Sequence, residues 1–187
     1  MTQKAKLALG TAGLAVLVAA AVVGYNVLAR TAALPAIELP AAGAAQRQPA
    51  VDFAMTDRDG NTVSLSQITA EGRPVVLNFW ASWCPACRAE KPGFESVHRD
   101  YGDSVKFVML ALVDGARETV ETATRYFESG GFTLPMYLDT AREGAAAYGI
   151  RALPTTVFID RDGYILTGIQ GMVPEDTLRQ AVAFMLE

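Results

Sequence analysis

One stretch, Asn78-Phe79-Trp80-Ala81-Ser82-Trp83-Cys84-Pro85-Ala86-Cys87-Arg88-Ala89-Glu90-Lys91-Pro92, decides the fold of this chain. It contains the only two cysteines among the 187 residues. The β-branched and aromatic residues of Val75 to Trp80 predict a strand, and the spacing of Arg88 to Tyr101 predicts a helix. Cysteines three residues apart at such a strand-to-helix junction can form and break a disulfide, because residues i and i+3 at a helix start are neighbours.

The position and number of the cysteines indicate a chemical role. A helix N-terminus favours negative charge, and so favours the thiolate of the leading residue, Cys84. Two cysteines are too few for a disulfide-stapled scaffold, and a chain of this length does not need one. A disulfide across so short a loop removes little entropy from the unfolded chain, so the pair is predicted to be reactive rather than architectural.

Charge is unevenly distributed along the chain. Residues 1–30 carry three basic side chains and no acidic one, so the other 157 residues hold 13 basic and 20 acidic side chains, a net charge of −7. A nucleic-acid surface needs clustered positive charge. This balance therefore argues against nucleic acid as a partner.

An uncharged run of 23 residues, Leu7 to Ala29, precedes the rest of the chain. As a helix rising about 1.5 Å per residue it would be roughly 35 Å long, enough to cross a bilayer. Lys4 and Lys6 before it predict an N-terminus in the cytoplasm and a folded domain outside. The alternative is a cleaved signal peptide, whose apolar region usually has only ~7–15 residues, although Ala32-Ala33 suits a cleavage site.

The chain is accordingly predicted to have three parts. Residues 1–30 form a transmembrane anchor in contact with the lipid bilayer through residues 7–29, and residues 31–49 form an Ala/Pro-rich tether. Residues 50–187 form the folded domain. Both possible fates of the anchor place this domain outside the cytoplasm.

Strands and helices alternate within the folded domain. Apolar runs at 75–80 and 105–113 predict central strands covered on both faces. The other predicted elements are a hairpin over Val51–Ile68 whose second strand is Thr62–Leu65, a helix over 118–129, a strand over 132–139, a helix over 142–148, a hairpin of 155–160 with 164–170, and a helix from Pro174 to Leu186. The helix after Cys84 is predicted to bend rather than end at Pro92, because an apolar face continues beyond it. This alternation predicts an α/β layer fold.

Other uses of paired cysteines fit this sequence less well. A closed zinc site needs four ligands, and besides the cysteines the chain offers one histidine, His98. Covalent haem attachment needs a histidine directly after the second cysteine, where Arg88 stands. A peroxide-reducing thiol enzyme stays open, although no second, distant cysteine is present to resolve an oxidised one.

Several motifs together resemble the thioredoxin superfamily: Trp83-Cys84-Pro85-Ala86-Cys87, Pro92, and Leu153-Pro154-Thr155 ahead of an apolar strand. The longer form, Asn-Phe-Trp-Ala-Ser-Trp-Cys-Pro-x-Cys-Arg-x-Glu, resembles the TlpA/ResA branch of membrane-anchored, extracytoplasmic thiol-disulfide oxidoreductases. The resemblance covers about residues 50–187. It implies a thioredoxin-like fold, in which helices flank a central mixed sheet, with an N-terminal β-hairpin, an inserted helix-strand element and one preceding transmembrane helix.

The resemblance also implies roles for residues of the site. Cys84 would be the exposed nucleophile, and Cys87 the buried thiol that resolves the mixed disulfide. Pro154 would be the cis-proline beside the disulfide, the alternative being an ordinary trans turn proline. Leu153 would offer its backbone to an extended substrate segment. The other predicted groove residues are Gly171, which a plain turn also explains, Trp83, which shields the disulfide, and Pro85, which tunes its potential.

One departure from thioredoxins concerns the proton acceptor. Thioredoxins carry a buried Asp six residues before the first cysteine, where this chain has Asn78, whose amide cannot take a proton. Glu90, one helical turn after Cys87, is the substitute that the TlpA/ResA resemblance implies. The alternative is a surface Glu in the first turns of a helix.

The expected function is reduction of disulfides in exported proteins, such as apocytochrome c or copper-site assembly proteins. Electrons would arrive through a membrane protein supplied by cytosolic thioredoxin, and the Cys84–Cys87 disulfide would be the only redox group, with no metal or other cofactor. Three alternatives stay open at this point: an oxidase that inserts disulfides, a binding module or chaperone for cysteine-containing segments, and a copper carrier.

Overall fold

The computed structural model describes residues 47–187. The predicted anchor at residues 7–29 and nearly all of the predicted tether lie outside this range. Within residues 47–187, no helix combines the length and the hydropathy needed to cross a membrane.

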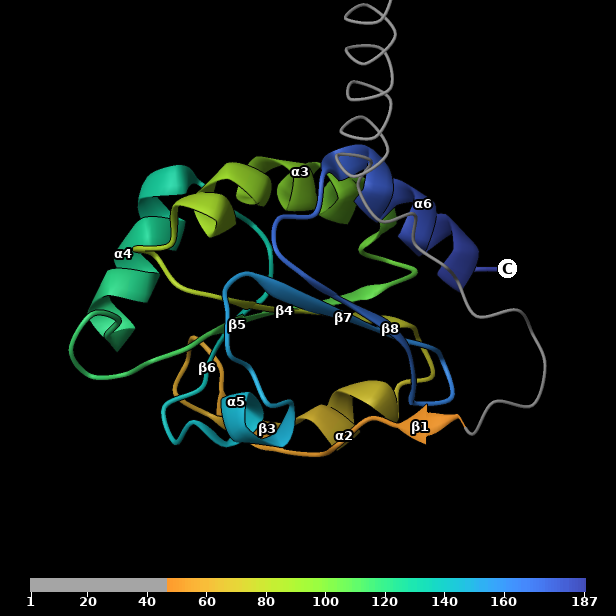
Figure 1. Cartoon of the computed structure of the whole chain (residues 1–187), viewed down its shortest axis with the longest axis horizontal. Coiled ribbons are helices and arrows are strands. Elements are labelled where there is room, and N and C mark those ends of the chain that lie inside the picture. The colour runs from red at the N-terminus through yellow and green to blue at the C-terminus, as the bar shows by residue number, and fades with distance from the viewer. Residues whose placement is uncertain (1–46) are drawn as a thin grey trace, which may run out of the picture. The chain divides into compact units, whose positions relative to one another are not determined.

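A mixed sheet with the strand order β1-β8-β7-β4-β5-β6-β2-β3 forms the centre of this domain (Figure 1). Strand β4 pairs in parallel with β5, which pairs in parallel with β6, whereas β4 pairs antiparallel with β7. The bounds are β1 Gln48–Pro49, β2 Ala54–Thr56, β3 Thr62–Ser64, β4 Val75–Trp80, β5 Lys106–Ala111, β6 Met136–Leu138, β7 Thr155–Ile159 and β8 Tyr164–Gln170.

Helices cover both faces of the sheet (Figure 1). Helices α3, α4 and α6 lie on one face, and the short helices α2 and α5 lie on the other. Their bounds are α2 Leu65–Thr69, α3 Pro85–Tyr101, α4 Val120–Gly130, α5 Glu143–Ala147 and α6 Glu175–Met185. The predicted thioredoxin-like α/β fold with a central mixed sheet is therefore confirmed.

The central strand β4 explains this two-sided cover. All six of its residues are buried, as its nearly all-apolar sequence predicts. Because successive side chains of a strand point to opposite faces, Val76 and Trp80 join the core beneath α3, α4 and α6. Leu77 and Phe79 join the separate core on the other face.

The helix after the cysteines continues through Pro92, as predicted, and ends at Tyr101. It begins at Pro85, three residues before the predicted start at Arg88. Proline suits the first turn of a helix, because its missing N–H would have no intrahelical partner there.

The predicted hairpin over Val51–Ile68 is only partly correct. Strands β2 and β3 pair antiparallel, but the chain turns into helix α2 at Leu65. Ser64 forms a capping box with Gln67: the Ser64 hydroxyl accepts from the Gln67 N–H at 3.2 Å, and the Gln67 side chain accepts from the Ser64 N–H at 2.7 Å. This cap begins a helix where the sequence predicts the end of a strand.

The sheet starts earlier than the predicted domain boundary at residue 50. Gln48 and Pro49 form the edge strand β1 and pair antiparallel with β8. The Arg47 guanidinium also forms an ion pair with Asp160. Proline is tolerated at a sheet edge, so an Ala/Pro-rich composition does not exclude a short strand here.

The inserted helix-strand element is helix α4 followed by strand β6. Thr119 caps α4 by accepting from the Thr122 N–H at 3.2 Å, and Gly131 ends the helix with a left-handed backbone at φ 64°. Strand β6 then adds to the sheet beside β5. The insertion thus follows β5 in the chain, and its helix α4 lies on the same face of the sheet as α3.

Candidate active site

Cys84 and Cys87 form a disulfide at the start of α3, with their Cα atoms 5.3 Å apart. Cys84 is the N-cap residue of the helix, and its Sγ accepts a hydrogen bond from the Cys87 N–H at 3.2 Å. On reduction, this N–H and the helix N-terminus favour a thiolate at Cys84. The junction between β4 and α3 therefore supplies the electrostatics that a nucleophilic sulfur needs.

The two cysteines differ in exposure less than the sequence predicts. Cys87 is fully buried, as predicted for a resolving thiol, but Cys84 keeps only 4 % exposure in the disulfide form. The prediction of an exposed Cys84 is wrong for this state, because both sulfurs belong to the core cluster beneath α3. The exposed groups flanking the pair are Pro85 and Trp83, the latter 38 % exposed.

The Leu153–Pro154 peptide bond is cis, as predicted. Gly171 donates its N–H to the Pro154 carbonyl at 2.8 Å and has a φ of 100°, which favours glycine over any residue with a side chain. Leu153 packs against the cluster that contains both cysteines. Within residues 47–187 its N–H and C=O have no backbone partner, so they remain available to an extended segment.

Glu90 is a buried residue, only 3 % exposed, rather than a surface glutamate. Its carboxylate accepts from the Asn78 Nδ2 at 2.9 Å and from the Val173 N–H at 2.9 Å. Burial raises the pKa of Glu90, while the two hydrogen bonds and the neighbouring Lys91 charge oppose that rise. Residues i and i+3 share a helix face, so Glu90 lies on the face of Cys87 and can serve as a proton acceptor.

Lys91 is a member of the site that the sequence analysis missed. It is fully buried, its Nζ lies 3.5 Å from Asn78 Oδ1, and the same atom lies 4.3 Å from the centroid of the Trp80 ring. Burial lowers the pKa of Lys91 to about 7, although the Glu90 charge opposes this shift. The spacing of Lys91 with Cys87 and Phe94, four residues before and three after, was the available signal that Lys91 points into the core.

A second buried carboxylate ties the inserted element to the disulfide loop. Glu118, just before α4, accepts from the Ser82 N–H at 2.5 Å and from the Thr122 hydroxyl at 2.9 Å. The adjacent Arg117 places its guanidinium 3.4 Å from the centroid of the Trp83 ring. These contacts hold the loop before Cys84 in place, and no sequence motif pointed to them.

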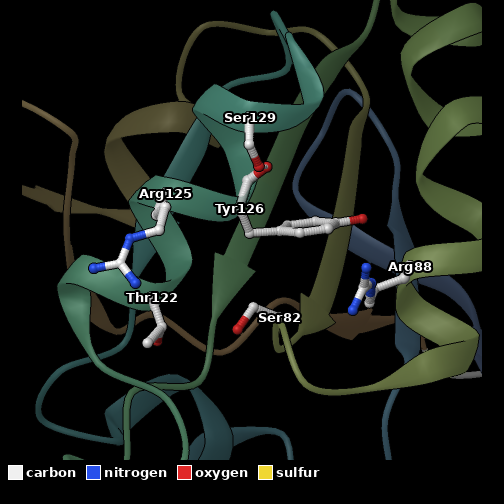
Figure 2. A pocket seen from close by; sticks show the side chains of 6 residues that line it. All are labelled: Ser82, Arg88, Thr122, Arg125, Tyr126 and Ser129. Carbon is white, nitrogen blue, oxygen red and sulfur yellow. Dashed lines mark hydrogen bonds between the residues drawn. The ribbon is translucent and has the colours of Figure 1, made fainter.

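Beside this loop lies an open pocket of about 250 Å³ (Figure 2). Figure 2 shows the Arg88 guanidinium and the Tyr126 ring approaching each other across it, with 5.6 Å between the guanidinium carbon and the ring centroid. The lining residues are Ser82, Arg88, Thr122, Arg125, Tyr126 and Ser129. Arg88, which follows Cys87 directly in the sequence, thus presents a cation to this pocket.

The site combines one disulfide whose first sulfur can become a stabilised thiolate with a carboxyl group able to take the proton of the second. A protein with this arrangement on a thioredoxin-like sheet exchanges its disulfide with the thiols of other molecules. The fold and the site therefore define a thiol-disulfide oxidoreductase.

Comparison with known proteins specifies the family. The model of the AhpC/TSA family matches residues 47–167, so the chain belongs to that family. Over 133 residues it is 32 % identical to the thiol-disulfide oxidoreductase ResA of Halalkalibacterium halodurans, covering 71 % of this chain and 73 % of that one. It is 33 % identical over 128 residues to the sporulation thiol-disulfide oxidoreductase A of Bacillus subtilis, covering 67 % and 75 %.

Solved structures agree with these relatives. StoA from Bacillus subtilis superposes with a TM-score of 0.61 at 29 % identity and covers 70 % of this chain and 96 % of its own. A thiol:disulfide interchange protein from Chlorobium tepidum gives a TM-score of 0.67 at 26 % identity, with coverages of 78 % and 100 %. Within the thioredoxin superfamily, this chain is a ResA-like thiol-disulfide oxidoreductase.

Proposed function

We propose that this protein is a reductant of disulfides in exported proteins, held by residues 7–29 in the cytoplasmic membrane of a bacterium. Its folded domain lies on the extracytoplasmic side, where the compartment is oxidising and a reductant must be resupplied. Electrons come from cytosolic thioredoxin through a membrane relay protein. The targets are cysteines that must stay reduced, such as those of apocytochrome c or of copper-site assembly proteins.

The proposed reaction needs only the two cysteines and one proton acceptor. The Cys84 thiolate attacks a substrate disulfide, one substrate sulfur leaves as a thiolate, and a mixed disulfide forms. Glu90 then takes the proton of Cys87, whose sulfur attacks Cys84 and releases the second substrate thiol. The substrate gains two electrons, the protein is left with the Cys84–Cys87 disulfide, and no metal or other cofactor takes part.

The observation that carries the proposed exchange reaction is the buried Glu90 carboxylate on the face of Cys87. A resolving thiol that is fully buried cannot readily pass its proton to water, so a nearby internal acceptor is needed. Glu90 is held for that task by Asn78 and by the Val173 N–H. Asn78 itself has no group that could accept the proton.

The surface around the disulfide suits an extended peptide. The open backbone of Leu153 can add a short β-type pairing. Met172 is 50 % exposed and lies between Gly171 and Val173, which bind the Pro154 carbonyl and the Glu90 carboxylate. Trp83 is 38 % exposed and directly precedes Cys84. Both can offer apolar contacts to a peptide. We therefore expect the substrate at Cys84 to be an extended polypeptide segment.

The reduction potential of the full-length chain in detergent tests the direction of electron flow. The protein is equilibrated with glutathione or dithiothreitol buffers, and the free thiols are trapped and counted. A potential near or below roughly −270 mV supports the proposed reductant, whereas a potential towards roughly −120 mV identifies an oxidase. Failure to form the Cys84–Cys87 disulfide would leave the binding module as the better proposal.

Membrane attachment needs a separate experiment. The native protein is fractionated from cells, and the mass of its N-terminal peptide is determined. We expect the protein in the membrane fraction with residues 7–29 retained. A soluble product that begins near Ala33 would instead show a cleaved signal peptide.

A further inference from the structure

The proposed reaction leaves one buried group without a role. Lys91 is the only basic side chain among residues 47–187 that is buried. Removing an ammonium group from water is costly unless a partner compensates, and replacing a buried ion pair by apolar residues is often neutral or stabilising. A buried lysine beside the reacting thiols is therefore poorly explained by stability alone.

The contacts of Lys91 lead to the proposed proton acceptor through one amide. Lys91 Nζ lies 3.5 Å from Asn78 Oδ1, while the Asn78 Nδ2 donates to Glu90 Oε1 at 2.9 Å and to Thr156 Oγ1 at 3.0 Å. The ammonium also lies over the faces of Trp80 and Phe127, 4.3 Å and 5.5 Å from their centroids. Lysine and glutamate thus contact opposite ends of the same carboxamide.

The hydrogen-bond chemistry of lysine fixes the orientation of that carboxamide. An ammonium group only donates, so it selects the amide orientation in which Oδ1 faces Lys91. The Nδ2 group then has to point at Glu90. In the reversed orientation, an amide oxygen would face a carboxylate oxygen and two donors would face each other.

We propose that Lys91 is a positioning residue for thiol-disulfide exchange: it orients Asn78 and keeps the buried Glu90 carboxyl anionic until Cys87 delivers its proton. This inference rests on the proposed role of Glu90. Burial by itself favours the neutral acid, which has no capacity to take a proton. The adjacent positive charge counters that tendency.

Few other charged groups reach this network from the elements packed around it. Helix α3 contributes Cys87 and the exposed Arg88. Helix α4 contributes Tyr126, whose ring contacts Trp80, and the loop before α4 contributes Glu118, which is bound to Ser82 and Thr122. Strand β7 contributes only the hydroxyl of Thr156. Lys91 is therefore the cation that compensates the negative charge of the Glu90 carboxylate.

The test measures the attack by Cys84 and the later attack by Cys87 as two separate phases. Reduced full-length protein in detergent is mixed with 5,5′-dithiobis(2-nitrobenzoate), which releases one coloured thiol when Cys84 attacks and a second when Cys87 resolves the mixed disulfide. In Lys91→Met we expect the first phase to be unchanged within about twofold. The second phase slows about tenfold at about pH 6.5, and its pH midpoint rises by about one unit or more, because a neighbouring opposite charge shifts a carboxyl pKa by ~1–3.

Three further variants make the outcome specific. Lys106→Met is the matched control, because Lys106 pairs with Glu71 on the surface, and it leaves both phases unchanged. Glu90→Gln slows the second phase, and in that background Lys91→Met adds no further slowing, since Lys91 acts through Glu90. Lys91→Gln, which keeps a donor but no charge, takes the place of Lys91→Met if that protein does not fold.

Two results would overturn the inference. In the first, Lys91→Met has the pH profile of the parent protein and only its stability changes. In the second, the substitution slows resolution equally with and without Glu90. A different result, an unaffected second phase in Glu90→Gln, would instead remove the proposed proton acceptor while leaving disulfide exchange itself intact.

Discussion

The two faces of strand β4 pack against different surroundings although their residues alternate along one strand. Phe79 points to the face covered by α2 and α5 and packs against Tyr148, with 5.5 Å between ring centroids. Its neighbour Asn78 points to the face covered by α3, where it contacts Glu90, Thr156 and Lys91. At this level the face covered by α2 and α5, here called the apolar face, has an aromatic and aliphatic core. The face covered by α3, here called the polar face, has a buried polar network.

The difference suggests that one face of the sheet mainly stabilises the fold, whereas the other holds the groups that take part in the proposed reaction. Apolar burial stabilises the fold by roughly 25 cal/mol for each Å² removed from water. Buried polar and charged groups cost free energy unless they are fully paired, so the network around Asn78 stabilises the fold less than an apolar core of similar size would. We therefore expect substitutions on the two faces to have different kinds of effect.

The largest expected effect is that of Cys84→Ser, at the start of helix α3 on the polar face. Exchange with a model disulfide should fall to the rate of the uncatalysed reaction, because serine cannot form the mixed disulfide. The unfolding midpoint should stay close to that of the reduced parent protein. Retained activity in a client-protection assay by this variant would favour a binding module over the redox mechanism.

The next expected effect lies on the apolar face. Phe79→Ala should lower the free energy of unfolding by about 3–5 kcal/mol, because the deletion leaves a cavity in a fully buried cluster. Urea denaturation of the oxidised protein measures this loss. Under conditions where the variant is folded, its reduction potential should match that of the parent, and a changed potential would show that the two faces are coupled.

The sequence predicted best those elements in which composition and structure agree. Strand β4 was predicted with its observed bounds, because five of its six residues are apolar and four are β-branched or aromatic. The cis bond before Pro154 was implied by the resemblance to the thioredoxin superfamily, and the pairing of Cys84 with Cys87 followed from the presence of only two cysteines.

The predictions from sequence missed those residues whose positions depend on contacts with distant segments rather than on their own residue type. Lys91 resembles a surface residue, since lysine is almost never fully buried, and its contacts with Asn78, Trp80 and Phe127 become visible only in the folded structure. Arg117 and Glu118 acquire their contacts with the disulfide loop from the insertion after β5. The short strand at Gln48 depends on pairing with β8, which local composition does not indicate.

The pH dependence of stability offers a third test of the polar face. The folded pKa of Lys91 is lowered from 10.5 to about 7, so between these values the unfolded chain binds a proton that the folded protein does not. The free energy of unfolding then rises with pH, by up to about 1.4 kcal/mol per unit. The oxidised parent should gain about 2 kcal/mol between pH 7 and 9, as measured by urea denaturation. Lys91→Met should lack this rise, and an equal rise in both proteins would mean that Lys91 is not the titrating group.

The smallest expected effects come from two helix caps that lie on opposite faces. Ser64 caps α2 on the apolar face, and Thr119 caps α4 on the polar face. Replacing either by alanine should lower the free energy of unfolding by about 1 kcal/mol, because one N–H at the helix start loses its acceptor.

Only the second cap should affect the site. Thr119 follows Glu118, which holds the Ser82 N–H, and Arg117, which lies over Trp83. Loosening this turn in Thr119→Ala should uncover the sulfur of Cys84 and speed its first reaction with an aromatic disulfide. Ser64→Ala is the matched control and should leave that rate unchanged. Equal rates in the two variants would show that the loop over the disulfide is held independently of the α4 cap, and that the polar face is more rigid than its contacts suggest.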